Sequence, residues 1–597
     1  MSPGHTPTEE QQKAVDAFVA GGTVAITAGA GAGKTSTLRL LAESRPAGRG
    51  LYLAFNKAVQ VEAARSFPAN VTAKTAHALA FRTHGLPLRA RLGGPRLSAA
   101  QVAQALGMGP VMLDTAEATV VVQPAQVAAL AMGSVLRFCR SADPEIGPSH
   151  FVAPQGAAGL ELSTLAEAVL GGARRAWEDL TSHTGRLKAA HDHYLKAWAL
   201  SGPGLGFDFI LYDEAQDADP CIAGVVLAQE AQLVAVGDPH QALYAWRGNA
   251  DLLSALPADH RVSLTRSWRF GDPIAAEANL WLALLGAELR IRGNPARASR
   301  LEALEAPDAV LTRTNAGAVR AVMAAHEAGR KVALVGGGRE VLRLAEAAHR
   351  MAEGLPSGHP ELVAFSTWDQ VVDYAESDPS GSDLATSVKL VCRFGPDAVI
   401  EAVGGAVTEA RANLVVSTVH KAKGREWDRV RAGDDFPAPT EHDGAAGMLA
   451  RSEAMLGYVA VTRARSLLDV GGLGWIHGHA ARHGITTKSA GPGVESPDRV
   501  LAAVGLALGM AARVDGERGI WRLDHFSKDG SVTAFGGPAG QWRSFRPEWC
   551  YPAEQRGRGG RMRRGVLPAE RRGLRAAWRA ERGLVAPESP ISKEVRS

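Results

Sequence analysis

The residues best suited to chemistry lie in a glycine-rich segment near the amino terminus. The segment AGAGAGKT extends from Ala28 to Thr35 and directly follows an apolar run, Val24–Thr27. Small residues allow consecutive backbone N–H groups to surround a phosphate, Lys34 supplies a positive charge, and the Thr35 hydroxyl can bind Mg²⁺. The pattern predicts a strand, a phosphate-binding loop and a helix, in that order. A glycine-rich turn without function is the alternative, and the strict pattern has Gly where Ala28 stands.

A second segment supplies two neighbouring carboxylates. DEAQD, from Asp213 to Asp217, follows the apolar run Phe209–Tyr212. Asp213 would emerge at the carboxyl end of a strand, where Mg²⁺ must be held, and Glu214 would accept a proton from the attacking water. Alone, such an acidic turn is as often a solvated surface or a helix cap. Together with a phosphate-binding loop it predicts nucleotide hydrolysis.

These two segments require parallel sheets to position them. Short apolar runs alternate with helical stretches, which is typical of strands that are buried on both faces and joined by right-handed crossovers. The runs are Val24–Thr27, Leu51–Phe55, Phe209–Tyr212, Leu233–Val236, Val310–Leu311, Val332–Val335 and Leu414–Val419. Ligands of such sheets bind at the carboxyl ends of the strands. We therefore expect an α/β fold with two parallel sheets.

Composition limits the remaining classes of protein. Of the 597 residues, 46% are apolar and 21% are charged, so several globular domains are expected and wholesale disorder is excluded. The first residues, MSPGHTPTEEQQKAV, lack a basic segment followed by an apolar stretch, and no run of some twenty uncharged apolar residues occurs. We therefore expect a cytoplasmic protein. The four cysteines are too far apart for a CxxC pair, which argues against a zinc site or a disulfide scaffold.

Domain boundaries follow from where the apolar runs stop. The expected parts are a first α/β domain (1–84 and 201–265), a helical insertion (85–200), a second α/β domain (266–340 and 413–470), a small mixed region (341–412) and a C-terminal extension (471–597). In the extension, Ile520–Leu523 and Ser531–Phe535 flank Lys528-Asp529-Gly530 and predict a hairpin. Residues 541–597 hold 14 Lys or Arg against 6 Asp or Glu, so the tail is either a solvated appendage or a nucleic-acid tether.

Seven further segments, together with the two above, form an ordered series between residues 8 and 470. They are TEEQQKAV, YLAFNKAV, AKTAHALAFR, VGDPHQALYAWRG, LTRSWRF, STVHKAKGREWD and YVAVTRAR. The series resembles the UvrD/Rep/PcrA-like superfamily 1A DNA helicases, and its wording is closest to the F-box DNA helicase branch. The resemblance implies two RecA-like motor domains of the P-loop NTPase class, 1A and 2A, with a helical insertion, 1B, and an accessory region, 2B.

The resemblance also implies a role for each matching residue. For catalysis it implies the lysine, both carboxylates, a γ-phosphate sensor and two arginine fingers, namely Lys34, Asp213, Glu214, Gln241, Arg269 and Arg463. The implied contacts to ATP are Gln11, Ala28, Gly29, Ala30, Gly31, Ala32, Gly33, Lys34, Thr35, Ser36, Trp268, Lys423, Gly424 and Glu426. The implied ligands of Mg²⁺ are Thr35 and Asp213. The implied DNA contacts are Phe55, Asn56, His77, Tyr244, Trp246, Arg247, Thr418 and His420.

Departures from the family pattern bear on function. Arg425 stands where an apolar residue is usual, and Trp268 stands where Tyr or Phe is commoner, which can alter the selectivity for adenine. Only 143 residues separate Phe270 from Leu414, and part of them must belong to 2A. A small 2B region is therefore expected, and strand separation is in greater doubt than translocation.

The function implied by the resemblance is that of an ATP-dependent DNA helicase or translocase that moves 3′ to 5′ on single-stranded DNA. It would unwind duplex in repair, replication or recombination. Single-stranded and tailed duplex DNA are the expected partners, no membrane partner is expected, and residues 471–597 could bind a protein. The alternative is a DNA-dependent ATPase subunit of a larger complex, in recombination control or phage defence, with weak unwinding on its own.

Lys34→Ala should weaken nucleotide binding and abolish DNA-stimulated ATP hydrolysis, because the ammonium supplies the charge that holds the phosphates. Phosphate release with and without single-stranded DNA checks this expectation. Undiminished turnover in the variant would overturn the site assignment.

Overall fold

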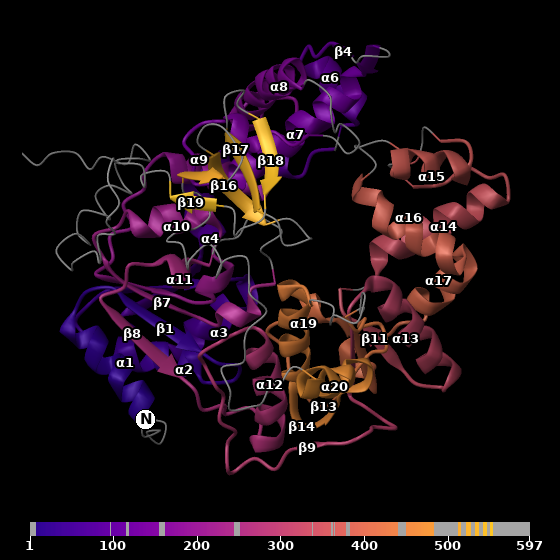
Figure 1. The fold of residues 1–597 in the computed structure, drawn as a ribbon. Coiled ribbons are helices and arrows are strands. Elements are labelled where there is room, and N and C mark those ends of the chain that lie inside the picture. Colours follow the sequence, from indigo (N-terminus) through magenta and orange to yellow (C-terminus); the bar gives the residue numbers. More distant parts are fainter. Residues whose placement is uncertain are drawn as a thin grey trace, which may run out of the picture.

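The structure is a computed structural model. It describes residues 7–95, 97–114, 119–153, 162–243, 251–336, 338–359, 362, 365–377, 382–439, 449–482, 511–514, 521–526, 532–536, 541–545 and 550–552. Figure 1 shows two α/β lobes side by side, each with a helical segment that extends from it. Within these ranges no helix is both long enough and apolar enough to cross a bilayer.

The first lobe contains a sheet of six parallel strands in the order β3-β2-β6-β7-β1-β8. The strands are β1 (Val24–Ala28), β2 (Gly50–Ala54), β3 (Val71–Thr75), β6 (Phe209–Tyr212), β7 (Gln232–Gly237) and β8 (His260–Leu264). The central strands are buried on both faces, which is why they form continuous apolar runs in the sequence. The edge strands β3 and β8 are half exposed and contain polar residues.

Helices cover both faces of this sheet. They are α1 (Glu9–Ala20), α2 (Lys34–Ser44) and α3 (Lys57–Ser66) on one face, and α9 (His191–Leu200), α10 (Pro220–Leu227) and α11 (Leu252–Ala255) on the other. Successive strand residues alternate between the two cores, so Ile26 packs with the first group of helices and Ala25 with the second.

The second lobe contains another sheet of six parallel strands, in the order β11-β12-β10-β13-β14-β9. The strands are β9 (Arg300–Leu301), β10 (Ala309–Thr312), β11 (Val332–Leu334), β12 (Leu414–Thr418), β13 (Trp427–Ala432) and β14 (Ala464–Asp469). Its helices are α12 (Asp272–Leu284), α13 (Asn315–Glu327), α18 (Val419–Ala422), α19 (Arg451–Val461) and α20 (Trp475–Arg482). The two all-parallel sheets confirm the predicted α/β fold.

The segment between β3 and β6 is mostly helical. Besides α9 it contains α4 (Ala76–Ala80), α5 (Arg89–Leu92), α6 (Ala99–Ala105), α7 (Pro124–Arg140) and α8 (Ser163–Thr181). A two-stranded hairpin, β4 (Val111–Asp114) with β5 (Thr119–Val122), also lies here and was not expected. Val111 and Leu113 pack into the core with α7 and α8, while Met112 between them is 65% exposed. The alternation of buried and exposed side chains in β4 is short, and the alanine-rich helical segments around it made it hard to recognise in the sequence.

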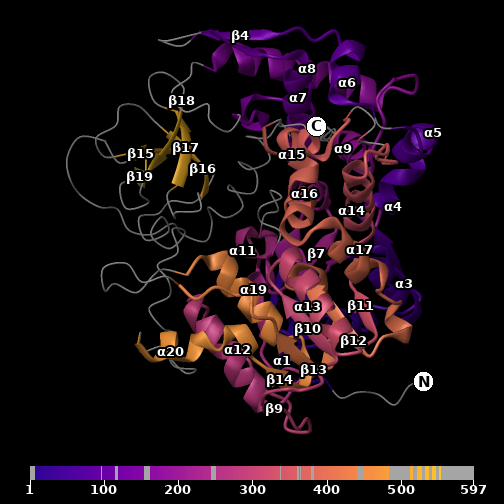
Figure 2. The ribbon, with the colours of Figure 1, turned by 90° about the vertical axis from the view of Figure 1, so that its right-hand side faces the viewer.

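The segment between β11 and β12 contains four helices, α14 (Arg339–Ala352), α15 (Trp368–Ser377), α16 (Ser382–Phe394) and α17 (Pro396–Gly404). A mixed segment was expected, but the residues described here form helices and no strand. Val399 and Val403 of α17 share a core with α13 and β11, and Figure 2 shows these four helices above α13 on the β11 side of the sheet.

The C-terminal extension contains a five-stranded antiparallel sheet in the order β18-β17-β16-β15-β19. The strands are β15 (Ala511–Val514), β16 (Trp521–Phe526), β17 (Val532–Gly536), β18 (Gln541–Phe545) and β19 (Cys550–Pro552). The pairing of β16 with β17 agrees with the hairpin predicted around Lys528-Asp529-Gly530. The basic tail after residue 552 lies outside the described residues.

Gly457→Ala should destabilise the second lobe. An added Cβ would lie 2.4 Å from the buried Trp281 ring, so the free energy of unfolding should fall by about 1–3 kcal/mol. Urea denaturation followed by tryptophan fluorescence measures the change. Gly133→Ala in α7 is the matched control, because nothing lies within 4 Å of its Cβ position, and it should raise stability by up to about 1 kcal/mol. Equal effects of the two substitutions would contradict this account.

Candidate active site between the two lobes

The glycine-rich segment forms the loop between β1 and α2. Gly31 and Gly33 have φ values of 73° and 80°, a left-handed conformation that glycine adopts without a steric penalty. A Cβ on Gly31 would lie 2.6 Å from Ser267 Oγ and 2.7 Å from Arg269 Cβ, so the segment after β8 packs directly on the loop. Ala28 is the last residue of β1 and has no positive φ, which explains why glycine is not needed there.

The loop lysine contacts the carboxylates that follow β6. Lys34 Nζ lies 2.5 Å from Glu214 Oε1. Asp213 is buried, and its carboxylate accepts hydrogen bonds from the Tyr52 hydroxyl at 2.6 Å and from the Glu214 N–H at 2.9 Å. Glu214 has a φ of 53°, which is uncommon for a residue with a side chain and is concentrated at functional sites.

Burial and neighbouring charges shift the pKa values of Asp213 and Glu214. Burial raises the pKa of Asp213, and the nearby charge of Glu214 raises it further. Burial also opposes ionisation of Glu214, but the ammonium groups of Lys34 and Lys423 outweigh it and lower the pKa to about 2. Because this pKa is depressed, the stabilisation from the Glu214 charge is fully present above the ordinary value of 4.5. It is lost only as the pH falls through about 2.

The loop after β7 connects these carboxylates to the second lobe. Asp238 is fully buried, and its Oδ2 accepts hydrogen bonds from Gln241 Nε2 at 2.7 Å and from the Tyr458 hydroxyl at 2.8 Å. The Asp238 N–H donates to Gln216 Oε1 at 3.1 Å, and Gln216 Nε2 donates to Glu214. The predicted γ-phosphate sensor Gln241 is therefore held by a buried carboxylate.

Both predicted arginine fingers lie where the two lobes meet. Arg463 follows α19, is buried, and donates from Nη2 to Gln241 Oε1 at 3.0 Å. Its hydrogen-bond partners among the described residues are all neutral groups. Burial lowers the pKa of Arg463 to about 9, and Arg269 acts in the same direction. Arg269 itself pairs with Glu426 and donates to the Thr462 carbonyl at 2.8 Å. A buried cation without a carboxylate is suited to bind an anion.

The two predicted adenine contacts border the same loop. Gln11 accepts the Thr8 N–H at 3.0 Å and donates from Nε2 to Thr37 Oγ1 at 3.3 Å. Trp268 Cδ1 lies 3.3 Å from the Cβ position of Gly33. Both side chains therefore lie where the loop enters α2, and their contact with a base stays a prediction.

The predicted phosphate and ribose contacts of the second lobe lie where it meets the first lobe. Lys423 pairs with Asp217 of the first lobe, and Gly424 is exposed with a φ of 80°. Glu426 binds Arg465 at 2.7 Å in addition to its arginine-finger partner. Glu426 would therefore have to release an arginine before its carboxylate could bind a ribose hydroxyl.

The residues predicted to bind Mg²⁺ lie on two elements of the first lobe. Thr35 lies exposed in the first turn of α2, and Asp213 directly follows the β6 strand. No group of three His, Cys, Asp or Glu that could hold a metal occurs in the described ranges. One hydroxyl and one carboxylate suit Mg²⁺ that arrives with phosphates and keeps its waters, which is its usual mode of binding. The donor set therefore fits a magnesium–nucleotide complex.

Comparison with known proteins agrees with this arrangement. A family model described as an AAA domain matches residues 11–247. F-box DNA helicase 1 of Gallus gallus is 30% identical over 504 residues, which cover 77% of this chain and 48% of that protein. F-box DNA helicase protein 1 of Schizosaccharomyces pombe (strain 972 / ATCC 24843) is 28% identical over 506 residues, covering 77% and 57%. This chain is related to the F-box branch of the superfamily 1 helicases.

The resemblance to this helicase branch that the sequence motifs indicated is thus confirmed. The chain spans about half the length of the curated helicases it matches. A solved structure titled "The structure of PRRSV helicase" aligns at 12% identity with a TM-score of 0.26, covering 78% of this chain and 56% of that one. A score this low supports no conclusion about fold or function.

The DNA contacts implied by the helicase resemblance follow strands in both lobes. Phe55 follows β2 and is 49% exposed, and Asn56 caps α3 by accepting the Val59 N–H at 3.0 Å. His77 follows β3 and lies 3.8 Å from Asp192. Thr418 ends β12 and His420 follows it in α18. The remaining three, Tyr244, Trp246 and Arg247, lie outside the described residues.

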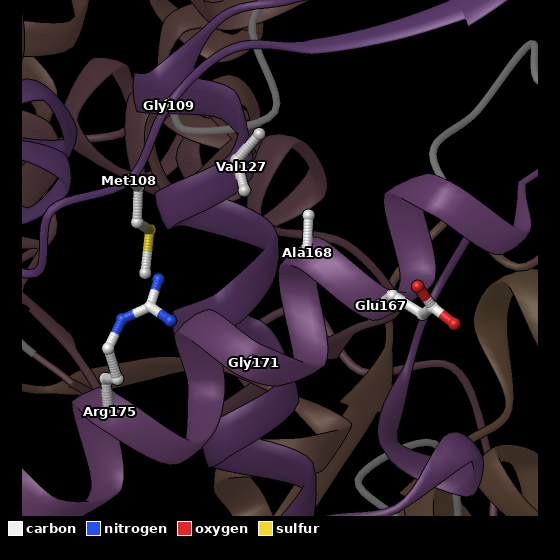
Figure 3. A pocket seen from close by; sticks show the side chains of 7 residues that line it. All are labelled: Met108, Gly109, Val127, Glu167, Ala168, Gly171 and Arg175. Carbon is white, nitrogen blue, oxygen red and sulfur yellow. The ribbon is translucent and has the colours of Figure 1, made fainter.

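A hollow of about 180 Å³ lies in the insertion of the first lobe, away from the helicase motifs. Its lining is Met108, Gly109, Val127, Glu167, Ala168, Gly171 and Arg175. Figure 3 shows Glu167 and Arg175 on opposite sides of it. Arg175 donates to the Leu106 carbonyl at 3.0 Å, so its charge holds the end of α6. The hollow brings together no groups for catalysis.

Sequence reasoning missed four residues of the helicase site, namely Tyr52, Gln216, Asp238 and Tyr458. Each lies inside a motif that the sequence displays, but the motif does not reveal which side chains meet. One signal was available: Gly237 precedes Asp238, and a Cβ there would lie 2.1 Å from Gln216 Oε1. Glycine at that position makes room for the Gln216 amide.

Glu214→Gln should retain binding of ATP and DNA but reduce ATP turnover by about 100-fold or more, because the amide cannot accept the proton of the attacking water. Steady-state phosphate release gives the rate, and titration with a fluorescent ADP analogue gives nucleotide affinity. Normal turnover in this variant would remove Glu214 as the base.

Proposed function

We propose that this chain is an ATP-dependent DNA helicase or translocase that moves 3′ to 5′ along single-stranded DNA and unwinds duplex in repair, replication or recombination. ATP and Mg²⁺ are the proposed cofactors, and the proposed location is cytoplasmic. The observation that supports it most directly is the contact between the lobes. There Arg463 of the second lobe binds Gln241 of the first, and Arg269 packs on the phosphate loop that ends at Lys34.

The two lobes contribute opposite charges to one site. Lys34 would exchange Glu214 for phosphate oxygens, which leaves the Glu214 carboxylate available to orient and deprotonate a water. Bound ATP supplies the phosphoanhydride bond whose cleavage drives the cycle. Arg463 enters this site hydrogen-bonded only to neutral groups among the described residues, and a γ-phosphate would provide an anion that it could bind directly.

Closure of the lobes would depend on that anion. While the γ-phosphate is present, Arg269 and Arg463 hold the second lobe against the first, and its loss favours opening. Repeated closure produces movement only if each lobe holds DNA differently in the two states. Phe55 of the first lobe and Thr418 of the second are candidates for such contacts.

Little sequence preference is expected. Stacking of a base on an exposed aromatic side chain such as Phe55 contributes about 1–3 kcal/mol per base, whichever base it is. Contacts to phosphates position the strand and do not distinguish its sequence. The names of both F-box helicase relatives support DNA as the substrate, and the 3′ to 5′ polarity rests on the family resemblance.

ATP hydrolysis by the full chain should rise at least about tenfold when single-stranded DNA is added, because DNA favours the closed lobes. A strand-displacement assay should then show unwinding of a 3′-tailed duplex and not of a 5′-tailed one. Glu214→Gln serves as the inactive control. An ATPase rate that does not change when DNA is added would refute the proposal. Unwinding of the 5′-tailed duplex would refute the proposed polarity.

A second candidate is a DNA-dependent ATPase subunit of a larger complex, in recombination control or phage defence, that unwinds weakly alone. The accessory segment supports it, because it is small and contains the four short helices α14 to α17. The family resemblance implies that this element regulates duplex engagement in larger relatives. DNA-stimulated hydrolysis without displacement of either duplex would favour this candidate. Residues 471–597 are the proposed place for its protein partner.

A further inference from the structure

Tyr458 of the second lobe makes two hydrogen bonds to the first lobe with a single hydroxyl group. The hydroxyl accepts the N–H of Ala30 in the phosphate loop at 3.1 Å and donates to Asp238 Oδ2 at 2.8 Å. All the surface of Tyr458 is buried, and its ring meets the His240 ring edge-on, with centroids 6.5 Å apart. A buried tyrosine hydroxyl requires partners, and here both partners belong to the opposite lobe.

The contact to Asp238 continues to the catalytic residues. The N–H of Asp238 donates to Gln216, Gln216 donates to Glu214, and Glu214 pairs with Lys34 at the end of the phosphate loop. The hydrogen bonds thus form a closed circuit that begins and ends in the same loop. Tyr458 is the member of this circuit that comes from the second lobe.

Asp238 also determines the position of Gln241. Its Oδ2 accepts both the Tyr458 hydroxyl and Gln241 Nε2, at 2.8 and 2.7 Å. This contact orients the Gln241 amide so that its oxygen accepts Arg463 Nη2 at 3.0 Å. Tyr458 and Arg463 are five positions apart, and Arg463 Nε donates to the Val459 carbonyl at 3.0 Å. The hydroxyl and the arginine finger must therefore move together.

We infer that Tyr458 is a positioning residue for ATP hydrolysis, whose hydroxyl fixes the phosphate loop and Asp238 only when the lobes are closed. The inference rests on the proposed function and adds to it a residue that touches no substrate. Separation of the lobes removes the hydroxyl, which leaves the Ala30 N–H without its partner and Asp238 with one donor fewer. The complete circuit therefore exists only while the second lobe is in contact with the first.

Tyr458→Phe tests this inference, because the ring stays and only the hydroxyl is lost. The kcat of DNA-stimulated ATP hydrolysis should fall about tenfold, whereas affinity for a fluorescent ADP analogue should change less than about threefold. Stimulation by DNA should also diminish, since closure no longer organises the loop. Tyr374→Phe, in α15 of the accessory segment, is the matched control and should keep the kcat of the original chain.

Asp238→Asn provides an independent variant in the same circuit. It should lower kcat to a similar extent. The kcat of the double variant, Tyr458→Phe with Asp238→Asn, should be close to that of whichever single variant has the lower kcat, because both substitutions break one network. If Tyr458→Phe fails to fold, as judged from its melting temperature, Asp238→Asn tests the same expectation alone.

Three outcomes are decisive. Absence of DNA-stimulated hydrolysis in the unsubstituted protein would refute the proposed function. If the unsubstituted protein is active and Tyr458→Phe leaves kcat unchanged, the role of the hydroxyl is refuted. The same holds for Asp238→Asn if only that variant folds. Fully additive losses in the double variant would refute the circuit.

Discussion

Attraction between charges buried where the two lobes meet is the interaction on which the rest of this site depends. The first lobe contributes Asp217 and the second contributes Lys423, and the two side chains form an ion pair between the lobes. Such groups are costly to bury singly, but they attract strongly in a medium of low polarity. The contact between the lobes is therefore favourable only while opposite charges from both sides remain paired.

The architecture explains why these charges meet. In each lobe the strands are parallel, so their carboxyl ends lie at one edge of the sheet. The phosphate loop follows β1, the acidic turn follows β6, and the segment with Asp238 follows β7, which places three loops side by side in the order of the strands. Helices pack on both faces of the first sheet and support the strands that these loops follow.

The sequence allowed the phosphate loop, the acidic turn and the α/β class to be predicted, because each depends on residues close together in the chain. The edge strands β3 and β8 escaped detection, since one exposed side allows polar residues such as Lys74 and Arg261. The hairpin β4–β5 was obscured by neighbouring alanine-rich helices. The contact between Asp238 and Tyr458 spans 220 positions, and no local pattern predicts a pair so far apart.

The left-handed backbone of Glu214 sets conformational stability against catalytic activity in this chain. Glycine or asparagine would occupy that conformation at lower cost, by about 1 kcal/mol or somewhat more. The fold thus tolerates a conformational penalty at the very residue with which it would activate water. Selection for the most robust fold alone would replace this glutamate, whereas selection for turnover would retain it.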